Sequence, residues 1–412
     1  MSAEINCSSV LKIKLIQQTP MIHFQFDEAG ACPRASEVKP KLDKYLIWKW
    51  KQTNTDVPEE WYISPRDEKT QKRANEALQY KLRIDAAGEA TVSLDPYPLY
   101  YGNMGDNVRN VKMLRGDAQL TVVCFNKDLL EFIKQTIPAF FQVHNFGRMQ
   151  DKGFGSYLAG NDATGTHKNL TEYYKAQKCY RMAYKRNAYE QRHTTRELNM
   201  TFEEWVFDDI KTVYSIMKSG RNIPGNSSLY QRSILFKYFY QRQNLPNEKK
   251  ALKDFEVSPK VMRTDTLQHI KNGDPQFAPR SENPDDYRYV RAVLGLGDHV
   301  EYIQDLNGDN RAIGRKETIK ISNQDIGRME SPLFFKVVKS SDGMIVYMVA
   351  RRVNEGIFDK NFTFKNMSRT THPSLTLRTP HEFNIDVFMN FFKDEYNAIK
   401  NIRARVEEVN ER

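Results

Sequence analysis

The sequence predicts an α+β fold that begins with a ferredoxin-like (RRM-like) domain, and three patterns in its 412 residues support that prediction. The segment up to residue 160 has the order strand, helix, strand, strand, helix, strand, which is the ferredoxin-like order. Helical patterns continue to residue 243, and strand patterns return after residue 285. We therefore expect an N-terminal ferredoxin-like domain at 1–165, a helical insertion or subdomain at 166–280, and a second β-containing portion at 281–412.

Alternation and helical spacing predict the first half of the N-terminal domain. VLKIKLIQQ (10–18) alternates apolar and polar residues, as a half-buried strand does. A helix is expected at about 35–48, with apolar residues on one face and lysines on the other. After a polar insertion at 51–75, strand-like runs at 77–85 and 90–95 flank the turn-forming AAGE, so they predict a hairpin.

The second half of this domain is predicted to end in a glycine-rich turn. AQLTVVCF (118–125) reads as a strand, and Asn126 can cap the amphipathic helix that follows it. The turn at 147–155 then leads into a last short strand, SYLAG. In such a domain the helices cover one face of an antiparallel sheet, so the other face or the loops remain to meet a ligand.

The region from 170 to 196 has helical spacing and a basic stripe. The basic residues of this stripe are Lys178, Arg181, Lys185, Arg192 and Arg196. Tyr173, Tyr180 and Tyr184 cluster on another face. Cations beside aromatic rings suit single-stranded RNA, but a solvated basic face with a tyrosine core predicts the same pattern.

The last portion mixes strands with one helix. YRYVRAVLGLG, ETIKISN and SPLFFKVVKSSDGMIVYMVARRV are strand-like, and Ser341, Asp342 and Gly343 form a hairpin turn in the last of these. The segment 383–409 has apolar residues at helical spacing and is expected to be an amphipathic helix docked on its own domain.

Composition restricts the class of protein. With 40% hydrophobic residues the chain can build a sizeable core, and a net charge of +10 attracts polyanions. We find no stretch long and apolar enough to span a bilayer and no export signal, and the four cysteines are widely separated. We therefore expect a cytoplasmic protein with reduced thiols, no membrane association, no metal site and no cofactor.

The loop FGRMQDKGFGS (146–156) is the strongest local signal. Glycines let the backbone approach a phosphate closely, while amide groups and two basic side chains can bind phosphates without reading bases. A tight helix-to-strand turn with solvated charges explains the same residues. The Walker pattern of nucleotide-binding loops is absent.

Three motifs, taken in order, resemble the RAMP superfamily of CRISPR-associated proteins: TPMIH (19–23), RASEVKPKLDKYL (34–46) and FGRMQDKGFGS. The later SPLFFKVVK (331–339) is also similar to a segment of these proteins. The resemblance implies a second ferredoxin-like portion with a C-terminal helix at 281–412. It also implies a subunit of a type III effector, similar to the end-capping subunit of Cmr complexes.

The resemblance further implies where RNA is bound. In the family, the turn after the first strand, the start of the first helix and the glycine-rich loop line the path of guide RNA. The corresponding residues here are Arg34, Lys39, Lys41, Gly147, Arg148, Lys152, Gly153 and Gly155. The expected function is to hold guide RNA, or the guide-target duplex, together with other CRISPR effector subunits in antiviral defence.

Two other functions remain open. Relatives of this superfamily include endoribonucleases that process guide RNA or cut target RNA, and His23 or Asp27 would then be the catalytic residue. Binding and assembly, rather than catalysis, is the leading expectation. The third possibility is a protein-interaction scaffold without direct RNA binding, whose positive charge serves solubility or an acidic partner.

Overall fold

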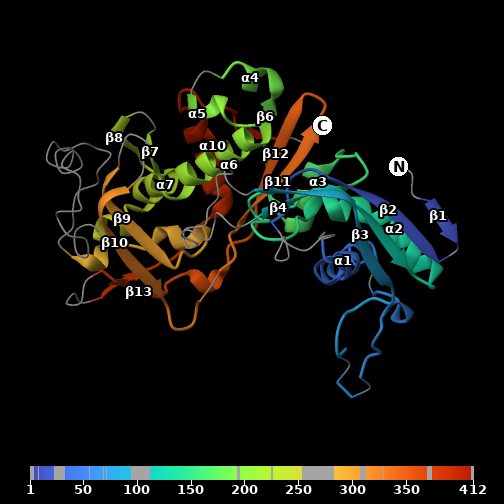
Figure 1. The fold of residues 1–412 in the computed structure, drawn as a ribbon. Coiled ribbons are helices and arrows are strands. Elements are labelled where there is room, and N and C mark those ends of the chain that lie inside the picture. Colours follow the sequence, from blue (N-terminus) through green and yellow to red (C-terminus); the bar gives the residue numbers. More distant parts are fainter. Residues whose placement is uncertain are drawn as a thin grey trace. The chain divides into compact units, whose positions relative to one another are not determined.

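The computed structural model divides into two compact units (Figure 1). The first unit contains Met1–Phe207, Phe334–Val349 and Glu408–Arg412, and the second contains Asp208–Leu333 and Ala350–Glu407. The residues that the structure describes are 4–7, 9–22, 33–54, 56–67, 69–70, 72–93, 112–192, 195–223, 226–252, 283–306, 312–327, 329–368 and 374–409. The domain boundaries expected near 165 and 280 stay a prediction.

The first unit begins with an antiparallel sheet of ferredoxin-like strand order. Its strands are β1 (Glu4–Cys7), β2 (Val10–Gln17), β3 (Lys81–Ser93), β4 (Lys112–Val123) and β5 (Tyr157–Ala159). The hydrogen-bonded order is β1-β2-β4-β3, and β5 also pairs with β2. Without β1, the order is fourth, first, third, second, as in a ferredoxin-like domain. The predicted fold class is therefore confirmed for this domain.

The hairpin predicted around AAGE is wrong. Residues 81–93 form the single strand β3, which pairs along its length with β4. The register of β3 against β4 shifts between Ala87 and Ala90, so an irregularity of the strand replaces the expected turn. β4 is long enough to pair on both sides of that irregularity, which a local turn signal does not reveal.

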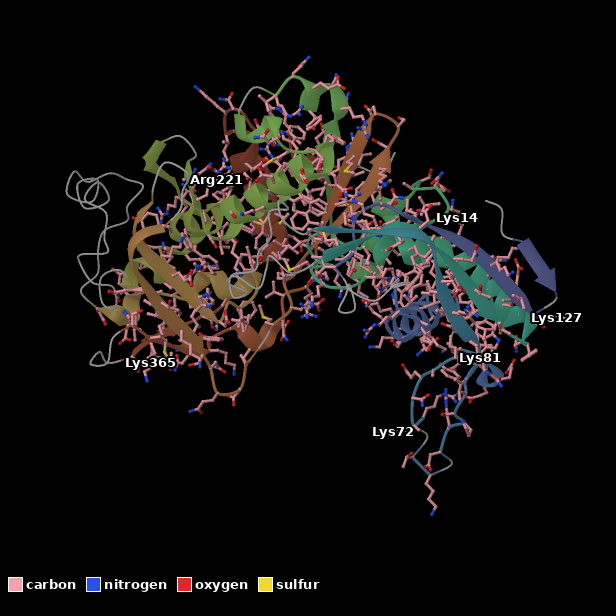
Figure 2. The ribbon with its side chains drawn as sticks, in the orientation of Figure 1. Lys14, Lys72, Lys81, Lys127, Arg221 and Lys365 are labelled. Carbon is pink, nitrogen blue, oxygen red and sulfur yellow. The ribbon has the colours of Figure 1, made fainter. Side chains whose placement is uncertain are left out.

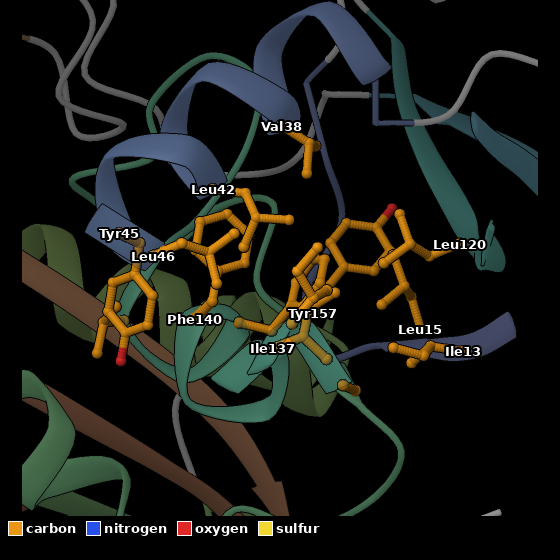
Figure 3. Packing of buried hydrophobic residues seen from close by; sticks show 14 of the residues in the cluster. Ile13, Leu15, Val38, Leu42, Tyr45, Leu46, Leu120, Ile137, Phe140 and Tyr157 are labelled. Atoms are coloured by element: carbon orange, nitrogen blue, oxygen red, sulfur yellow. The ribbon is translucent and has the colours of Figure 1, made fainter. Parts of the chain in front are cut away.

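Helices α1 (Ala35–Trp50) and α2 (Lys127–Val143) cover one face of this sheet (Figure 3). The Asn126 side chain accepts a hydrogen bond from the Leu129 amide at 2.9 Å, so the predicted cap is confirmed. The core contains buried residues from both helices and the sheet: Leu15, Val38, Leu42, Leu46, Leu120, Ile137, Phe140 and Tyr157. Both helices therefore pack on the face of the sheet that Leu15 and Leu120 line.

A second sheet repeats the same strand order. Its strands are β6 (Cys179–Lys185), β11 (Leu333–Ser340), β12 (Gly343–Ala350) and β15 (Glu407–Glu408), hydrogen-bonded in the order β11-β12-β6-β15. Along the chain, α6 (Phe202–Lys218) lies between the first and second of these strands, and α10 (Ile385–Asn397) between the third and fourth. The expected second ferredoxin-like strand order is present, but its first strand lies at 179–185, far before residue 281.

The continuous helix predicted over 170–196 is wrong. α3 (Thr166–Tyr174) ends at Lys175, whose φ is 51°, and β6 follows before the short helix α4 (Arg186–Glu190). The side chains of β6 alternate, with Tyr180 and Tyr184 buried and Arg181 and Lys185 exposed. The pattern CYRMAYK fits this strand as well as a helix, and pairing with β12 determines which one forms.

The second unit contains a separate four-stranded antiparallel sheet. Its strands are β9 (His299–Leu306), β10 (Ala312–Ser322), β13 (Asn361–Asn366) and β14 (Leu375–Arg378), in the order β14-β13-β10-β9. The remaining elements along the whole chain are η1 (Glu59–Trp61), α5 (Thr195–Leu198), β7 (Arg221–Ile223), β8 (Asn226–Gln231), α7 (Ile234–Gln243), α8 (Glu248–Ala251), η5 (Pro284–Asp286), η6 (Val290–Leu294) and η7 (Glu355–Ile357). Within the described parts of the chain, no helix has the length and apolar character needed to cross a membrane.

The C-terminal helix is shorter than predicted. α10 ends at Asn397, although its buried face has the expected residues, including Phe388 and Phe392. The Asn397 side chain donates to the Val406 carbonyl at 2.8 Å and accepts from the Val406 amide at 2.9 Å. These two bonds hold the following chain in a turn, so the helix does not continue to residue 409.

Candidate nucleic-acid interface

The segments that carry the family resemblance meet at one place in the first unit, where β2 ends. The Thr19 hydroxyl donates to the Gly153 carbonyl at 2.7 Å and accepts from the Ser156 amide at 2.9 Å. The Ser156 hydroxyl in turn donates to the Val337 carbonyl of β11 at 2.7 Å. We call this region the motif junction and define it as residues 19–22, 34–41, 145–156 and 335–339.

Two glycines of the loop are fixed by crowding of the backbone. Gly155 has a φ of 68°, and a Cβ atom there would lie 1.9 Å from the Phe146 carbonyl oxygen. Gly147 has a φ of 81°, and its Cβ would lie 2.6 Å from the Ile22 carbonyl oxygen. Only glycine fits such positions without rearrangement. The loop is therefore held in one shape by contacts with the chain after β2.

The amide groups of these glycines already have acceptors inside the protein. The Gly155 amide donates to the Pro20 carbonyl at 2.8 Å. The Gly147 amide donates to the Glu37 carboxylate, with its two oxygens at 3.1 and 3.2 Å. The Gly153 amide donates to the Gln150 carbonyl at 3.3 Å. A phosphate would reach these amides only by displacing the present acceptors. These hydrogen bonds therefore favour a role for the glycines in shaping the loop.

Lys41 connects α1 to the loop. Its ammonium group lies 2.8 Å from Glu37 Oε1, 2.8 Å from Gln150 Oε1 and 3.2 Å from the Asn145 carbonyl oxygen. These three acceptors satisfy the three donors of a lysine. The structure therefore places the predicted residue Lys41 at the junction, with its charge already used to join two segments.

Lys39 points to the other side of α1 and binds a carboxylate. Its ammonium group lies 2.8 Å from Asp43 Oδ2 and 3.1 Å from the Leu78 carbonyl oxygen. It also lies 4.2 Å from the centroid of the Tyr80 ring. Burial raises the pKa of Asp43, and the hydrogen bond and charge of Lys39 oppose that rise. Lys39 therefore neutralises a buried acid one turn further along the same helix.

The remaining predicted cations differ in exposure. Lys152 is only 9% exposed, and its ammonium group lies 5.7 Å from the centroid of the Phe335 ring. Arg34 and Arg148 are half-buried. Arg34 stands at the start of α1, and the Arg148 amide donates to the Ile22 carbonyl at 2.9 Å. Both arginines are therefore more accessible than Lys152.

Sequence reasoning missed Lys336, which lies beneath the junction. This side chain is fully buried, and burial lowers its pKa well below the usual value for lysine. Its ammonium group lies within hydrogen-bond distance of four oxygens: Phe141 O at 2.6 Å, His144 O at 2.7 Å, Asn145 Oδ1 at 3.1 Å and Tyr157 O at 3.3 Å. Lys336 thus caps the carboxyl end of α2 and fixes the beginning of the loop. The sequence feature that could have revealed Lys336 is a single lysine inside the apolar run SPLFFKVV.

The two catalytic candidates, His23 and Asp27, lie outside the described residues. Of the stripe predicted at 170–196, Lys178 pairs with Glu408 at 2.9 Å, and the side chain of Arg196 is outside the described part. Among the side chains that the structure describes, no group of three or more His, Cys, Asp or Glu residues has a geometry that could hold a metal ion.

Comparison with protein families identifies the chain. The Cmr1 N-terminal domain profile matches residues 8–221, and the Cmr1 C-terminal domain profile matches residues 230–410. The chain belongs to the Cmr1 family. Cmr1 is a RAMP subunit of the type III Cmr complex, so the predicted membership of the RAMP superfamily is confirmed.

Among solved structures, the chain is similar to Cmr1 from Pyrococcus furiosus in its apo form. The two share 10% sequence identity with a TM-score of 0.38, and the match covers 97% of this chain and 98% of the other. A search of curated proteins found no match. The assignment to the Cmr1 family rests on the two domain profiles, which together extend from residue 8 to residue 410.

Proposed function

We propose that this Cmr1-family subunit binds RNA as a structural component of a type III CRISPR effector, acting in antiviral defence in the cytoplasm. It holds guide RNA or the guide-target duplex by the RNA backbone, while base pairing supplies sequence specificity. The observation that carries this proposal is the motif junction, where all the segments resembling RAMP proteins are hydrogen-bonded together beside Arg34 and Arg148.

The proposed roles of the junction residues follow from their partners. Arg34 and Arg148 contact phosphates directly, because guanidinium groups bind phosphate oxygens with two parallel hydrogen bonds. Lys39, Lys41 and Lys152 act indirectly, since each holds a carboxylate, a carbonyl group or an aromatic ring of the protein. The three glycines, Gly147, Gly153 and Gly155, shape the loop that presents Arg148.

The test is to express the protein with its neighbouring effector subunits, purify the complex and sequence the RNA that it retains. The wild type is compared with an Arg34→Ala/Arg148→Ala double variant. We expect wild-type complexes to retain repeat-derived guide RNA. In the double variant, this subunit should bind about tenfold less RNA. A loss of this size is expected when two charge-assisted phosphate contacts are removed.

The matched control is Lys51→Ala/Lys72→Ala, which removes the same charge from two exposed positions of the first unit away from the junction. If both double variants lose RNA equally, general positive charge explains binding and the motif junction does not. An intact complex in which this subunit never contacts RNA would contradict the proposed function and favour a protein scaffold.

A further inference from the structure

The face of the first sheet that points away from α1 and α2 carries several exposed cations. Successive side chains of a strand point to opposite faces, and Leu11, Ile13 and Leu15 of β2 point to the helix-covered core. The residues between them, Lys12 and Lys14, therefore point away from the helices, and both are exposed.

The register of the sheet extends this charge across three strands. Lys12 is opposite Thr121 of β4, and Thr121 is opposite Arg83 of β3. One step along the sheet, Val123 is opposite both Val10 and Lys81. Lys81 and Arg83 are exposed, like Lys12 and Lys14. We call these four cations, Lys12, Lys14, Lys81 and Arg83, the basic sheet face; Figure 2 marks Lys14 and Lys81.

Three acids share this face with the four cations: Asp85, Asp117 and Glu4, which is opposite Lys12 in the pairing of β1 with β2. Asp117 lies 3.4 Å from Lys14, and Asp85 lies 2.8 Å from Arg83. The Lys14 and Arg83 side chains remain 63% and 78% exposed, so these pairs are weak and yield easily to a stronger anion. Lys12 and Lys81 make no ion pair with any side chain that the structure describes.

An exposed aromatic ring lies at the end of this face. Phe125 follows β4 directly and is 86% exposed, the highest value among the large exposed hydrophobic side chains in the described chain. It lies two residues after Val123, whose side chain points to the same side of the sheet as these cations. An aromatic ring in water beside several cations is the arrangement with which proteins bind single strands, because bases stack on the ring while cations bind the phosphates.

We propose that the basic sheet face and Phe125 bind a single-stranded segment of RNA, with phosphates on Lys12, Lys14, Lys81 and Arg83 and one base stacked on Phe125. This inference rests on the proposed function and adds a second RNA-contacting surface to it. The motif junction follows the carboxyl end of β2, and Phe125 lies near its amino end, where Val10 pairs with Val123. Strand length then separates the two surfaces by about 20 Å.

The ligand is single-stranded because a base within a duplex cannot stack on a protein side chain without being unstacked. A protein partner fits less well, since the centres of protein interfaces are depleted in charged residues and this face has four cations. Docking of another subunit on the same face is therefore treated as an outcome that overturns the inference.

The test measures binding of fluorescent single-stranded oligouridine to the purified full-length protein. Phe125→Ala should weaken binding about 5- to 150-fold, and Phe125→Trp should restore it, because stacking needs only an aromatic ring. Lys12→Ala/Arg83→Ala should lower the dependence of log affinity on log salt by about 1.4, or about 0.7 for each phosphate that is no longer neutralised. Since all three side chains are exposed, thermal stability should not change.

Ile63→Ala, at another exposed apolar side chain, is the control for Phe125, and Lys51→Ala/Lys72→Ala is the control for the charge change. If Phe125→Ala binds like Ile63→Ala, the inference is wrong, even when Arg34→Ala/Arg148→Ala still loses guide RNA and upholds the proposed function. If Phe125→Ala binds RNA normally but no longer assembles with its neighbouring subunits, the face docks protein and the inference is also overturned.

Discussion

Individual residues of the motif junction are constrained by their immediate neighbours, and Gly155 has the least room. Its positive φ and its contact with the Phe146 carbonyl exclude any side chain. Gly160 has a similar φ of 76°, but no atom lies within 4 Å of the position where its Cβ would be. Substitutions at the two glycines can therefore distinguish the energetic cost of the backbone conformation from the cost of steric crowding.

Gly155→Ala should lower the free energy of unfolding by about 3 kcal/mol or more, because it combines an unfavourable φ with a clash. Gly160→Ala should cost only about 1 kcal/mol, the cost of the φ alone. Denaturant unfolding of both variants measures the difference. Equal losses would mean that the loop moves easily away from Phe146.

Lys39→Ala should destabilise the protein by about 2 kcal/mol, because it leaves the buried Asp43 carboxylate without its cation. Lys44→Ala, at an exposed position of the same helix, should change stability by less than about 0.5 kcal/mol. Once folded, both variants should retain similar amounts of RNA. A stable Lys39→Ala protein with a specific loss of RNA would make Lys39 a direct phosphate contact instead.

Among the helices and strands, the sequence predicts the ones whose patterns lie within the segment itself. β2, α1 and α2 follow from alternation, helical spacing and the Asn126 cap, all of which lie within each segment. β6 was not predicted, because its partner β12 lies more than 150 residues later and CYRMAYK fits either periodicity.

The candidate site was predicted only in part for the same reason. The glycine-rich loop, Arg34 and Arg148 are visible in the sequence, but the acceptors of Lys39 and Lys41 are brought to them by folding. Asp43 is one helical turn from Lys39, whereas Leu78 and Gln150 are far away in the sequence. Which of the predicted cations bind acceptors within the protein therefore depends on the tertiary structure.

His144, which follows α2, should make stability depend on pH. Its Nδ1 lies 3.1 Å from the Phe140 carbonyl oxygen, and burial lowers its pKa from 6.5 to about 3. Between these values the unfolded chain binds a proton that the folded protein does not, so stability falls as pH decreases below 6.5. At pH 5 this contribution should cost about 2 kcal/mol relative to pH 8.

His144→Gln should flatten the dependence of stability on pH between 5 and 7 relative to the wild type. Thermal unfolding across this pH range provides the measurement. An unchanged slope in His144→Gln would show that other groups dominate the acid sensitivity.

At the scale of the whole molecule, the first unit is completed by residues far apart in the sequence. Its second sheet combines β6 with β11 and β12, and the motif junction needs Lys336 and the neighbouring carbonyl groups of β11. The N-terminal family profile ends at residue 221 and therefore omits these strands. The N-terminal sequence domain and the first compact unit therefore contain different sets of residues.

A fragment of residues 1–221 should consequently fail to unfold cooperatively, because Tyr180, Tyr184 and the carboxyl end of α2 lose the strands that bury them. A fragment in which a flexible linker joins residues 334–349 to the same chain should regain a cooperative transition. Calorimetry of the two fragments compares them. Equal cooperativity would mean that β11 and β12 are dispensable for this unit.

The proposed function requires that this Cmr1-family subunit contacts RNA through the motif junction. Ultraviolet crosslinking of the assembled complex, followed by mass spectrometry of the nucleotide-linked peptides, tests it most directly. We predict crosslinked peptides from residues 34–41 or 146–156, and their loss in the Arg34→Ala/Arg148→Ala variant. Crosslinks confined to the other subunits, in a complex that retains its RNA, would show that the motif junction does not contact RNA.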